Sequence, residues 1–182
     1  MEHKTHPIEG LIEFIPRVFR DERGWFMETY NASMFAPFGI SPVFVQDNES
    51  VSKKGVLRGL HFQRPPYAQG KLVRVASGRA LDVALDLRKN SPTYGQHATC
   101  ILDAEQHNML YIPEGFAHGF VALEDDTSFL YKCTNLYHQP SEGGILWNDP
   151  KLGIAWGVEE SVAVLSEKDR KYPTLAQASD LF

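Results

Sequence analysis

Three features are scarce in this sequence: cysteine, long apolar runs and an excess of positive charge. Only two of the 182 residues are cysteines, Cys100 and Cys133, and neither lies in a CxxC pair. Two cysteines cannot form a disulfide framework, so we expect two buried free thiols in a reducing cytoplasm. The first ten residues, MEHKTHPIEG, contain no apolar stretch, which argues against a signal peptide. No run approaches the roughly 20 apolar residues of a membrane-spanning helix, so no membrane partner is expected.

The acidic balance limits the partners of the protein. The formal net charge is −5, and broad nucleic-acid binding needs a basic face, so no nucleic-acid partner is expected. A small anionic ligand is compatible with this charge, because a few local cations are enough to bind it. The length of 182 residues, with 43% hydrophobic and 23% charged residues, predicts one globular domain spanning residues 1–182.

Room for long helices is also scarce, because glycine and proline recur at short intervals from Gly55 to Gly119. The period-two alternation in ALDVALDL (80–87) predicts a strand, and LVRVASG (72–78) and FLYKCTN (129–135) are similar short runs. Only NASMFAPFG (31–39), with Asn31 as N-cap, and SEKDRKY (166–172) have a helical pattern. We therefore predict an all-β fold, a jelly-roll barrel with a few short peripheral helices.

Two motifs resemble those of the metal-binding cupin barrels. The first cupin motif places two histidines and a glutamate between glycines, and Gly55, His61 and Gly78 match part of it. The second motif has a P-x-G turn followed by a histidine, as in PEGFAHGF (113–120), which contains His118. The resemblance indicates a cupin-type double-stranded β-helix.

The metal ligands of these motifs are largely missing. Gln63 replaces the second histidine, and Lys71 stands in place of the carboxylate. A divalent site of this kind needs three or four nitrogen or oxygen donors, and a lysine ammonium repels the metal. We therefore expect no bound metal, with His61 and His118 free for proton chemistry. Each histidine taken alone is better explained as a satisfied core residue, but His61, Arg58 and Lys71 together in one turn-rich segment favour a functional site.

Several charged and titratable side chains could bind an anion and move a proton. Arginine and lysine bind phosphate oxygens, and the candidates are Arg23, Arg58, Lys71 and Lys168. His61 is a candidate general base, because the usual histidine pKa lies close to neutral pH. A base needs an orienting partner, for which Asp169 is a candidate, although its spacing from Ser166 favours a helix cap. Tyr131 and Tyr137 could be ordinary strand aromatics.

Taken together, eight segments in order resemble the dTDP-4-dehydrorhamnose 3,5-epimerase family, a nucleotide-sugar branch of the cupin barrels. They extend from about residue 8 to residue 174 and read DERGWFMETY, FVQDNESVSKKGVLRGLHFQ, PPYAQGKLVRVASG, DVALDLRKNSPTYGQ, YIPEGFAHGF, FLYKCTN, ILWNDPKLGIAW and LSEKD. The resemblance implies inversion of carbons 3 and 5 of dTDP-4-dehydro-6-deoxy-D-glucose through an enolate. It implies neither a metal nor an organic cofactor, and it places the reaction in dTDP-L-rhamnose biosynthesis.

The resemblance also implies roles for individual residues. His61 matches the family's base, Asp169 its orienting carboxylate, and Tyr131 the acid on the opposite face of the sugar. Lys71 matches a cation beside the sugar 4-oxygen, and Tyr137 the aromatic that stacks on thymine. The further substrate-binding matches are Arg23, Phe26, Glu28, Gln46, Asn48, Arg58, His118, Glu142 and Lys168. Glu28 and Glu142 are expected to come partly from the second subunit or a loop.

The resemblance further implies a homodimer in which an N-terminal segment crosses to the partner. It leaves single or double epimerisation open, because relatives that invert one carbon share most of this pattern. Two other classes compete: a non-catalytic sugar-nucleotide binding barrel, and a metal-dependent cupin. The complete set of His61, Asp169 and Tyr131 disfavours the first, and Gln63 with Lys71 disfavours the second.

Overall fold

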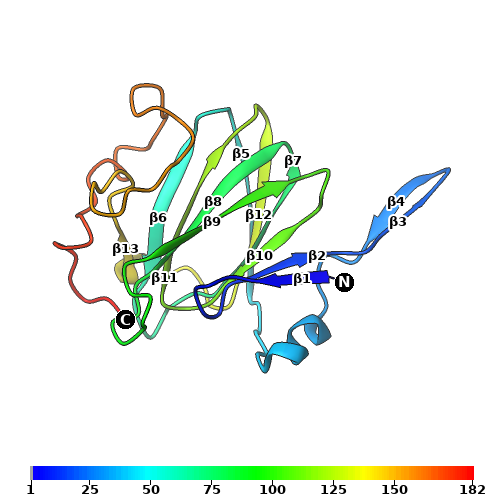
Figure 1. The fold of residues 1–182 in the computed structure, drawn as a ribbon, viewed down its shortest axis with the longest axis horizontal. Coiled ribbons are helices and arrows are strands. Elements are labelled where there is room, and N and C mark those ends of the chain that lie inside the picture. The colour runs from blue at the N-terminus through cyan, green and yellow to red at the C-terminus, as the bar shows by residue number, and fades with distance from the viewer. Residues whose placement is uncertain (1) are drawn as a thin grey trace.

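The computed structural model of the protein describes residues 2–182, which form two facing antiparallel sheets and a projecting hairpin (Figure 1). One sheet has six strands in the order β1-β2-β10-β7-β12-β5, and the other has five in the order β13-β6-β11-β8-β9. The hairpin consists of β3 and β4. The elements are β1 (Glu2–Thr5), β2 (Ile12–Ile15), β3 (Val18–Asp21), β4 (Gly24–Met27), η1 (Ala32–Phe38), β5 (Gln46–Ser52), β6 (Leu57–Gln63), β7 (Lys71–Ser77), β8 (Arg79–Asp86), β9 (His97–Asp103), β10 (Met109–Ile112), β11 (Phe116–Ala122), β12 (Thr127–Cys133), η2 (Gln139–Ser141) and β13 (Glu142–Gly144).

The predicted all-β barrel with a few short helices is confirmed, as are the three predicted strands. They correspond to β7, β8 and β12. A core of side chains from both sheets fills the interior, including Val73 from β7, Ala84 from β8 and Phe129 from β12. Both cysteines are buried and free, as expected. No helix within residues 2–182 is long and apolar enough to cross a membrane.

Strand β8 is buried on both of its faces. Its large apolar side chains, Leu81, Val83 and Leu85, pack outward, in a second core with Trp147 and Trp156. Since strand side chains alternate, the other face of β8, with its small and acidic residues, is turned into the barrel. The alternation of ALDVALDL therefore marks a strand whose polar face is the inner one.

The C-terminal segment, residues 145–182, supplies the cover for this outer face. Irregular turns after β13 lie beside the five-stranded sheet, at the β6 and β13 side (Figure 1). The Trp156 indole N–H donates to the Trp147 carbonyl at 2.8 Å, and Val164 forms an isolated bridge with Val56 next to β6. This packing carries residues 166–169 to the barrel, where they reach the site described below.

The two helix predictions had different outcomes. Residues 32–38 form the 3₁₀ helix η1, and the Asn31 side chain accepts from the Ser33 N–H at its N-terminus, so this cap is confirmed. The segment 166–172 is not a helix but a series of turns, so that prediction is wrong. The Ser166 hydroxyl does accept from the Asp169 N–H at 3.1 Å, but the Asp169 side chain is used elsewhere.

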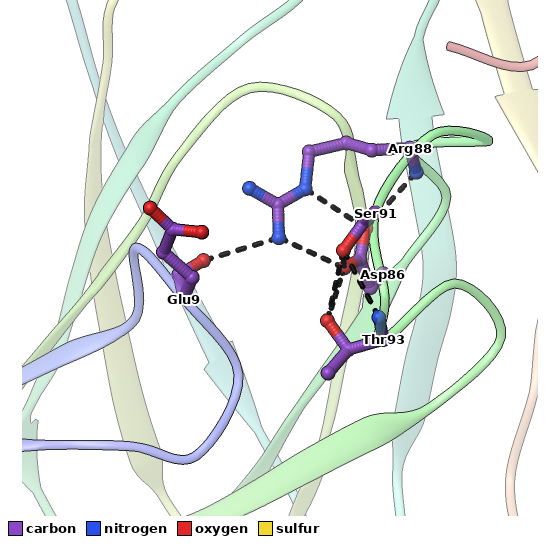
Figure 2. Close-up of polar contacts among 5 residues, drawn as sticks. All are labelled: Glu9, Asp86, Arg88, Ser91 and Thr93. Carbon is purple, nitrogen blue, oxygen red and sulfur yellow. Dashed lines mark hydrogen bonds and ion pairs between the residues drawn. The ribbon is translucent and has the colours of Figure 1, made fainter.

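A buried carboxylate ties the β8–β9 loop to the N-terminal loop (Figure 2). Asp86 accepts hydrogen bonds from the Arg88 guanidinium and from the hydroxyls of Ser91 and Thr93, at 2.6–2.9 Å. Arg88 also donates to the Glu9 carbonyl at 3.1 Å. Burial opposes ionisation of Asp86, but these donors prevail and lower its pKa to about 2. The loop is therefore held in place by an ionised side chain.

Candidate active site

A cavity of about 430 Å³ opens between the two sheets. A smaller recess of about 100 Å³ adjoins it and shares three of its lining side chains, His61, Lys71 and Tyr131. The cavity is also lined by Arg58, His118, Lys168 and Asp169, and the recess by Gln46, Asn48, Tyr137 and Glu142. The fold thus gathers eleven of the fourteen predicted site residues.

Pairing of β6 with β11 brings the two predicted histidines together. His61 and His118 are direct cross-strand partners in this register. The strands approach closely at Gly59 and Gly119, where a Cβ on Gly119 would lie 2.7 Å from the Arg58 carbonyl oxygen. The absence of side chains at these glycines therefore sets the spacing of the histidine pair.

His61 and Asp169 form the closest polar pair of the cavity. The distance from His61 Nε2 to Asp169 Oδ1 is 2.5 Å, and Asp169 is only 3% exposed. Burial alone would raise the pKa of Asp169, but hydrogen bonds with His61 and Ser166, together with nearby Lys168, lower it. An ionised Asp169 orients the ring and leaves Nδ1 to take a proton. The capping role that spacing favoured for the Asp169 side chain is wrong.

A second histidine–carboxylate pair, absent from the sequence predictions, lies beside the first. His118 Nε2 is 2.7 Å from Asp82 Oδ2, and Asp82 is fully buried on the inner face of β8. Burial lowers the pKa of His118, and the charges of Lys71 and His61 act in the same direction, although Asp82 opposes them. An acidic residue inside the apolar run ALDVALDL was the available signal for Asp82.

Lys71 and Tyr131 extend from the opposite sheet. Lys71 begins β7 and Tyr131 lies on the neighbouring strand β12, with the Lys71 Nζ atom 5.8 Å from the centre of the Tyr131 ring. Burial lowers the pKa of Lys71, while the negative charges of Asp82 and Glu142 oppose that shift. Burial raises the pKa of Tyr131, so its phenol keeps its proton at neutral pH. Such a phenol is suited to donate a proton rather than to take one.

A polar network crosses the mouth of the recess. Lys168 Nζ lies 2.5 Å from one Glu142 oxygen, and the Tyr137 hydroxyl donates to the other at 3.1 Å. The Tyr137 backbone N–H donates to the Gln46 side-chain oxygen at 2.8 Å, and the Gln46 amide in turn donates to Asn48 at 3.0 Å. Glu142 thus reaches the recess of its own chain from β13.

Three predicted residues do not reach the cavity within one chain. Arg23 and Phe26 lie at the β3–β4 hairpin, which projects away from the barrel (Figure 1). Arg23 pairs with Asp21 on the same hairpin, and Phe26 is 68% exposed. Glu28 follows β4 and accepts a hydrogen bond from the Asn31 side chain. One protomer therefore does not combine these side chains with His61.

The donor set of the cavity does not suit a metal. Within residues 2–182, no three histidine, cysteine or acidic side chains are arranged to hold an ion. The Gln63 amide is engaged with backbone groups, and the Lys71 side chain lines both the cavity and the recess. His61 and His118 are each paired with a carboxylate instead.

Fold and site together define a class: a cupin-like barrel whose cavity carries acid–base side chains and cations. The sequence model of dTDP-4-dehydrorhamnose 3,5-epimerase matches residues 5–177, and the chain belongs to this family. It is 56% identical to the dTDP-4-dehydrorhamnose 3,5-epimerase of Salmonella typhimurium over 94% of this chain and 93% of that one.

Solved structures of the family superimpose on the whole barrel. The dTDP-4-dehydrorhamnose 3,5-epimerase of Elizabethkingia anophelis has a TM-score of 0.94 and 45% identity, covering 99% of this chain and 98% of that chain. A dTDP-6-deoxy-D-glucose-3,5-epimerase of Legionella pneumophila, solved in complex with dTDP-4-keto-L-rhamnose, has a TM-score of 0.93. It is 44% identical and covers 98% of this chain and 94% of that chain. The family resemblance found in the sequence is therefore confirmed.

Proposed function

We infer that the protein inverts carbons 3 and 5 of dTDP-4-dehydro-6-deoxy-D-glucose and so forms dTDP-4-dehydro-L-rhamnose. The 4-keto group makes the C–H bonds on both neighbouring carbons acidic, because the electron pair left behind delocalises onto the carbonyl oxygen. Each inversion then needs a base on one face of the sugar and an acid on the other. The enzyme acts in dTDP-L-rhamnose biosynthesis, and we place it in the cytoplasm.

The observation that carries this proposal is the position of His61 and Tyr131 on facing sheets. His61 is on β6 and Tyr131 on β12, and both line the same cavity. We assign His61 Nδ1 as the base that removes the protons from carbons 3 and 5, one at a time, and releases each proton to water before it takes the next. The Tyr131 hydroxyl donates a proton to the opposite face and regains one from water. A single group returning its own proton would retain the configuration instead.

Lys71 is assigned to the enolate oxygen. When the base removes a proton, negative charge moves onto the 4-oxygen, and a fixed cation at that point lowers the barrier. Its location in the same cavity and recess as His61 and Tyr131, with Nζ 5.8 Å from the centre of the Tyr131 ring, supports this role. Asp169 stabilises the imidazolium that His61 becomes, in the way that a buried carboxylate supports a catalytic histidine.

The remaining cavity side chains are assigned to binding of the nucleotide sugar. Arg58 and Lys168 supply cationic donors for the diphosphate, and His118 contacts the sugar. Tyr137, which is 55% exposed at the recess, stacks on thymine, and Gln46, Asn48 and Glu142 bind beside it.

We further propose a homodimer in which the β3–β4 hairpin of one protomer completes the site of the other. The hairpin carries Arg23 and Phe26 away from its own barrel and exposes Trp25 by 52%. In such a dimer, the Arg23→Ala and His61→Ala variants are each inactive alone, and activity should be recovered when the two are co-expressed. Mixed dimers contain one site with both functional residues. A monomer by sedimentation, or no recovery, would refute this assembly.

Proton exchange with solvent tests the reaction directly. The purified protein is incubated with its ketosugar in heavy water, and deuterium at carbons 3 and 5 is followed by NMR. Label at both carbons is expected. Label at one carbon only would assign the protein to the mono-epimerases. No label at either carbon would instead indicate a non-catalytic barrel that binds a sugar nucleotide.

Two variants separate the assigned roles. His61→Ala should abolish exchange at both carbons, because no base remains. Tyr131→Phe should reduce net turnover far more than the initial removal of a proton. Equal loss of both rates in Tyr131→Phe would contradict its assignment as the acid.

A further inference from the structure

Gln63 occupies a position that the acid–base chemistry does not use. It lies on β6 two residues beyond His61, and its side chain is only 4% exposed. In a metal-binding cupin this position would hold a ligand, yet here the side chain is an amide. A buried amide must have its hydrogen bonds satisfied, so its partners indicate its task.

The partners of Gln63 are backbone groups of two loops. Its Nε2 atom donates to the Tyr67 carbonyl at 2.7 Å and to the Leu136 carbonyl at 3.1 Å. Its Oε1 atom accepts from the His138 N–H at 2.7 Å. Leu136 and His138 are the two chain neighbours of Tyr137. Gln63 therefore holds the backbone on both sides of the exposed aromatic ring.

Other contacts join the same two loops. The Gln69 side chain donates to the Asn135 carbonyl at 2.8 Å, and Asn135 donates to the Pro66 carbonyl at 3.1 Å. The rings of Tyr67 and His138 stack at 3.7 Å with an interplanar angle of 14°. Among these contacts, only Gln63 joins both loops to the strand that carries His61.

We propose that Gln63 is a positioning residue that orders residues 136–138 before the nucleotide binds. This inference rests on the proposed function, which assigns Tyr137 to the thymine base. A loop that is already ordered does not lose conformational freedom on binding, so affinity for the base increases. Gln63 thereby couples the base subsite to the strand that carries the catalytic histidine.

Substitution of Gln63 by methionine keeps the length of the side chain and removes all three hydrogen bonds. The Kd of the full-length Gln63→Met protein for dTDP, measured by calorimetry, should rise about tenfold or more. The cost of ordering one residue is of this size. The Kd for pyrophosphate, which lacks the base, should stay within about twofold, and so should kcat at saturating substrate. Gln177→Met, the same change at an exposed side chain that lines neither the cavity nor the recess, is the matched control and should alter neither Kd.

A double-mutant cycle separates positioning from general damage. In a Tyr137→Ala background, Gln63→Met should raise the Kd for dTDP by less than about twofold, because the ring that it positions is gone. A full tenfold effect in that background, or equal weakening of dTDP and pyrophosphate, would overturn the inference. If Tyr137→Ala alone leaves dTDP binding unchanged, it is the assignment of Tyr137 in the proposed function that fails.

The wild-type protein offers a test that needs no substitution. The His138 amide proton, which donates to Gln63, should be protected from hydrogen exchange in the ligand-free protein. Exchange of this proton at the rate of an unstructured peptide before dTDP is added would refute the proposal. Protection present before binding and unchanged by it would support an ordered loop.

Discussion

The pair formed by His61 and Asp169 permits a quantitative prediction for Asp169→Asn. The substitution keeps the size of the side chain and an oxygen that can accept from His61 Nε2. It removes the negative charge beside the ring. The carboxyl group is 3% exposed and its pKa is lowered, so the wild-type group is ionised throughout the neutral pH range. The variant therefore tests the charge separately from the geometry.

The magnitude follows from the distance between the charges. His61 becomes positive only when it has taken a proton from the sugar, so the attraction to Asp169 develops along the reaction. With nitrogen and oxygen 2.5 Å apart, the charge centres lie about 4 Å apart, where an effective dielectric of about 20 gives about 4 kcal/mol. The hydrogen bond that asparagine retains offsets part of this energy. We expect kcat to fall by about 10²- to 10³-fold.

Steady-state turnover and solvent exchange by NMR provide the assay. Both rates should fall in parallel for Asp169→Asn, because proton removal is the step that loses support. Asp149→Asn is the matched control: Asp149 is also 3% exposed and accepts two backbone hydrogen bonds, from Lys151 at 3.0 Å and Leu175 at 2.8 Å, outside the cavity. It should lower stability and leave kcat unchanged. A kcat for Asp169→Asn within tenfold of wild type would refute the assigned role.

Three further predictions concern Asp86, which holds the β8–β9 loop, Lys71, which is assigned to the enolate oxygen, and Gly119, where β6 and β11 approach closely. The pKa of Asp86, lowered to about 2 from 3.8, contributes about 2 kcal/mol of stability that is present above pH 4 and lost as the pH falls through 2. Urea titrations should therefore show that Asp86→Asn is about 2 kcal/mol less stable than wild type at pH 7, a gap that narrows in acid; a constant gap would contradict this. Lys71→Met should reduce kcat by about 10²- to 10³-fold with little change in dTDP binding, and an active variant would remove Lys71 from the mechanism. In Gly119→Ala the new Cβ would lie 2.7 Å from the Arg58 carbonyl, so the free energy of unfolding should fall by about 1–3 kcal/mol, and an unchanged urea midpoint would refute the close approach.

Local patterns determined the class of fold. Alternating apolar residues and frequent turn residues predicted strands, and β7, β8 and β12 follow these runs closely because side chains of a strand must alternate between two faces. The segment 166–172 shows the limit of such patterns. It has a capping serine, but Asp169 contributes to the cavity and the segment forms turns rather than a helix.

The order of eight sequence segments was enough to identify the family, since long motifs in a fixed order are far more specific than any one residue. From the residues alone, His61 could be a core histidine and Asp169 a helix cap. Only the tertiary structure pairs them across more than a hundred residues of chain, because turns after β13 fold back onto β6. The same holds for Asp82, whose partner His118 lies on a neighbouring strand.

Sequence by itself thus determined the fold class, the family and the chemical types in the site, since these depend on residue identity and local order. Tertiary structure decided which groups meet. It showed that Gln63, which stands at the position of a cupin metal ligand, binds the backbone on both sides of Tyr137. It also placed Arg23 on a hairpin that projects away from its own barrel. Contacts between distant segments depend on sheet register and on packing of the whole chain, and neither is encoded within a short stretch of residues.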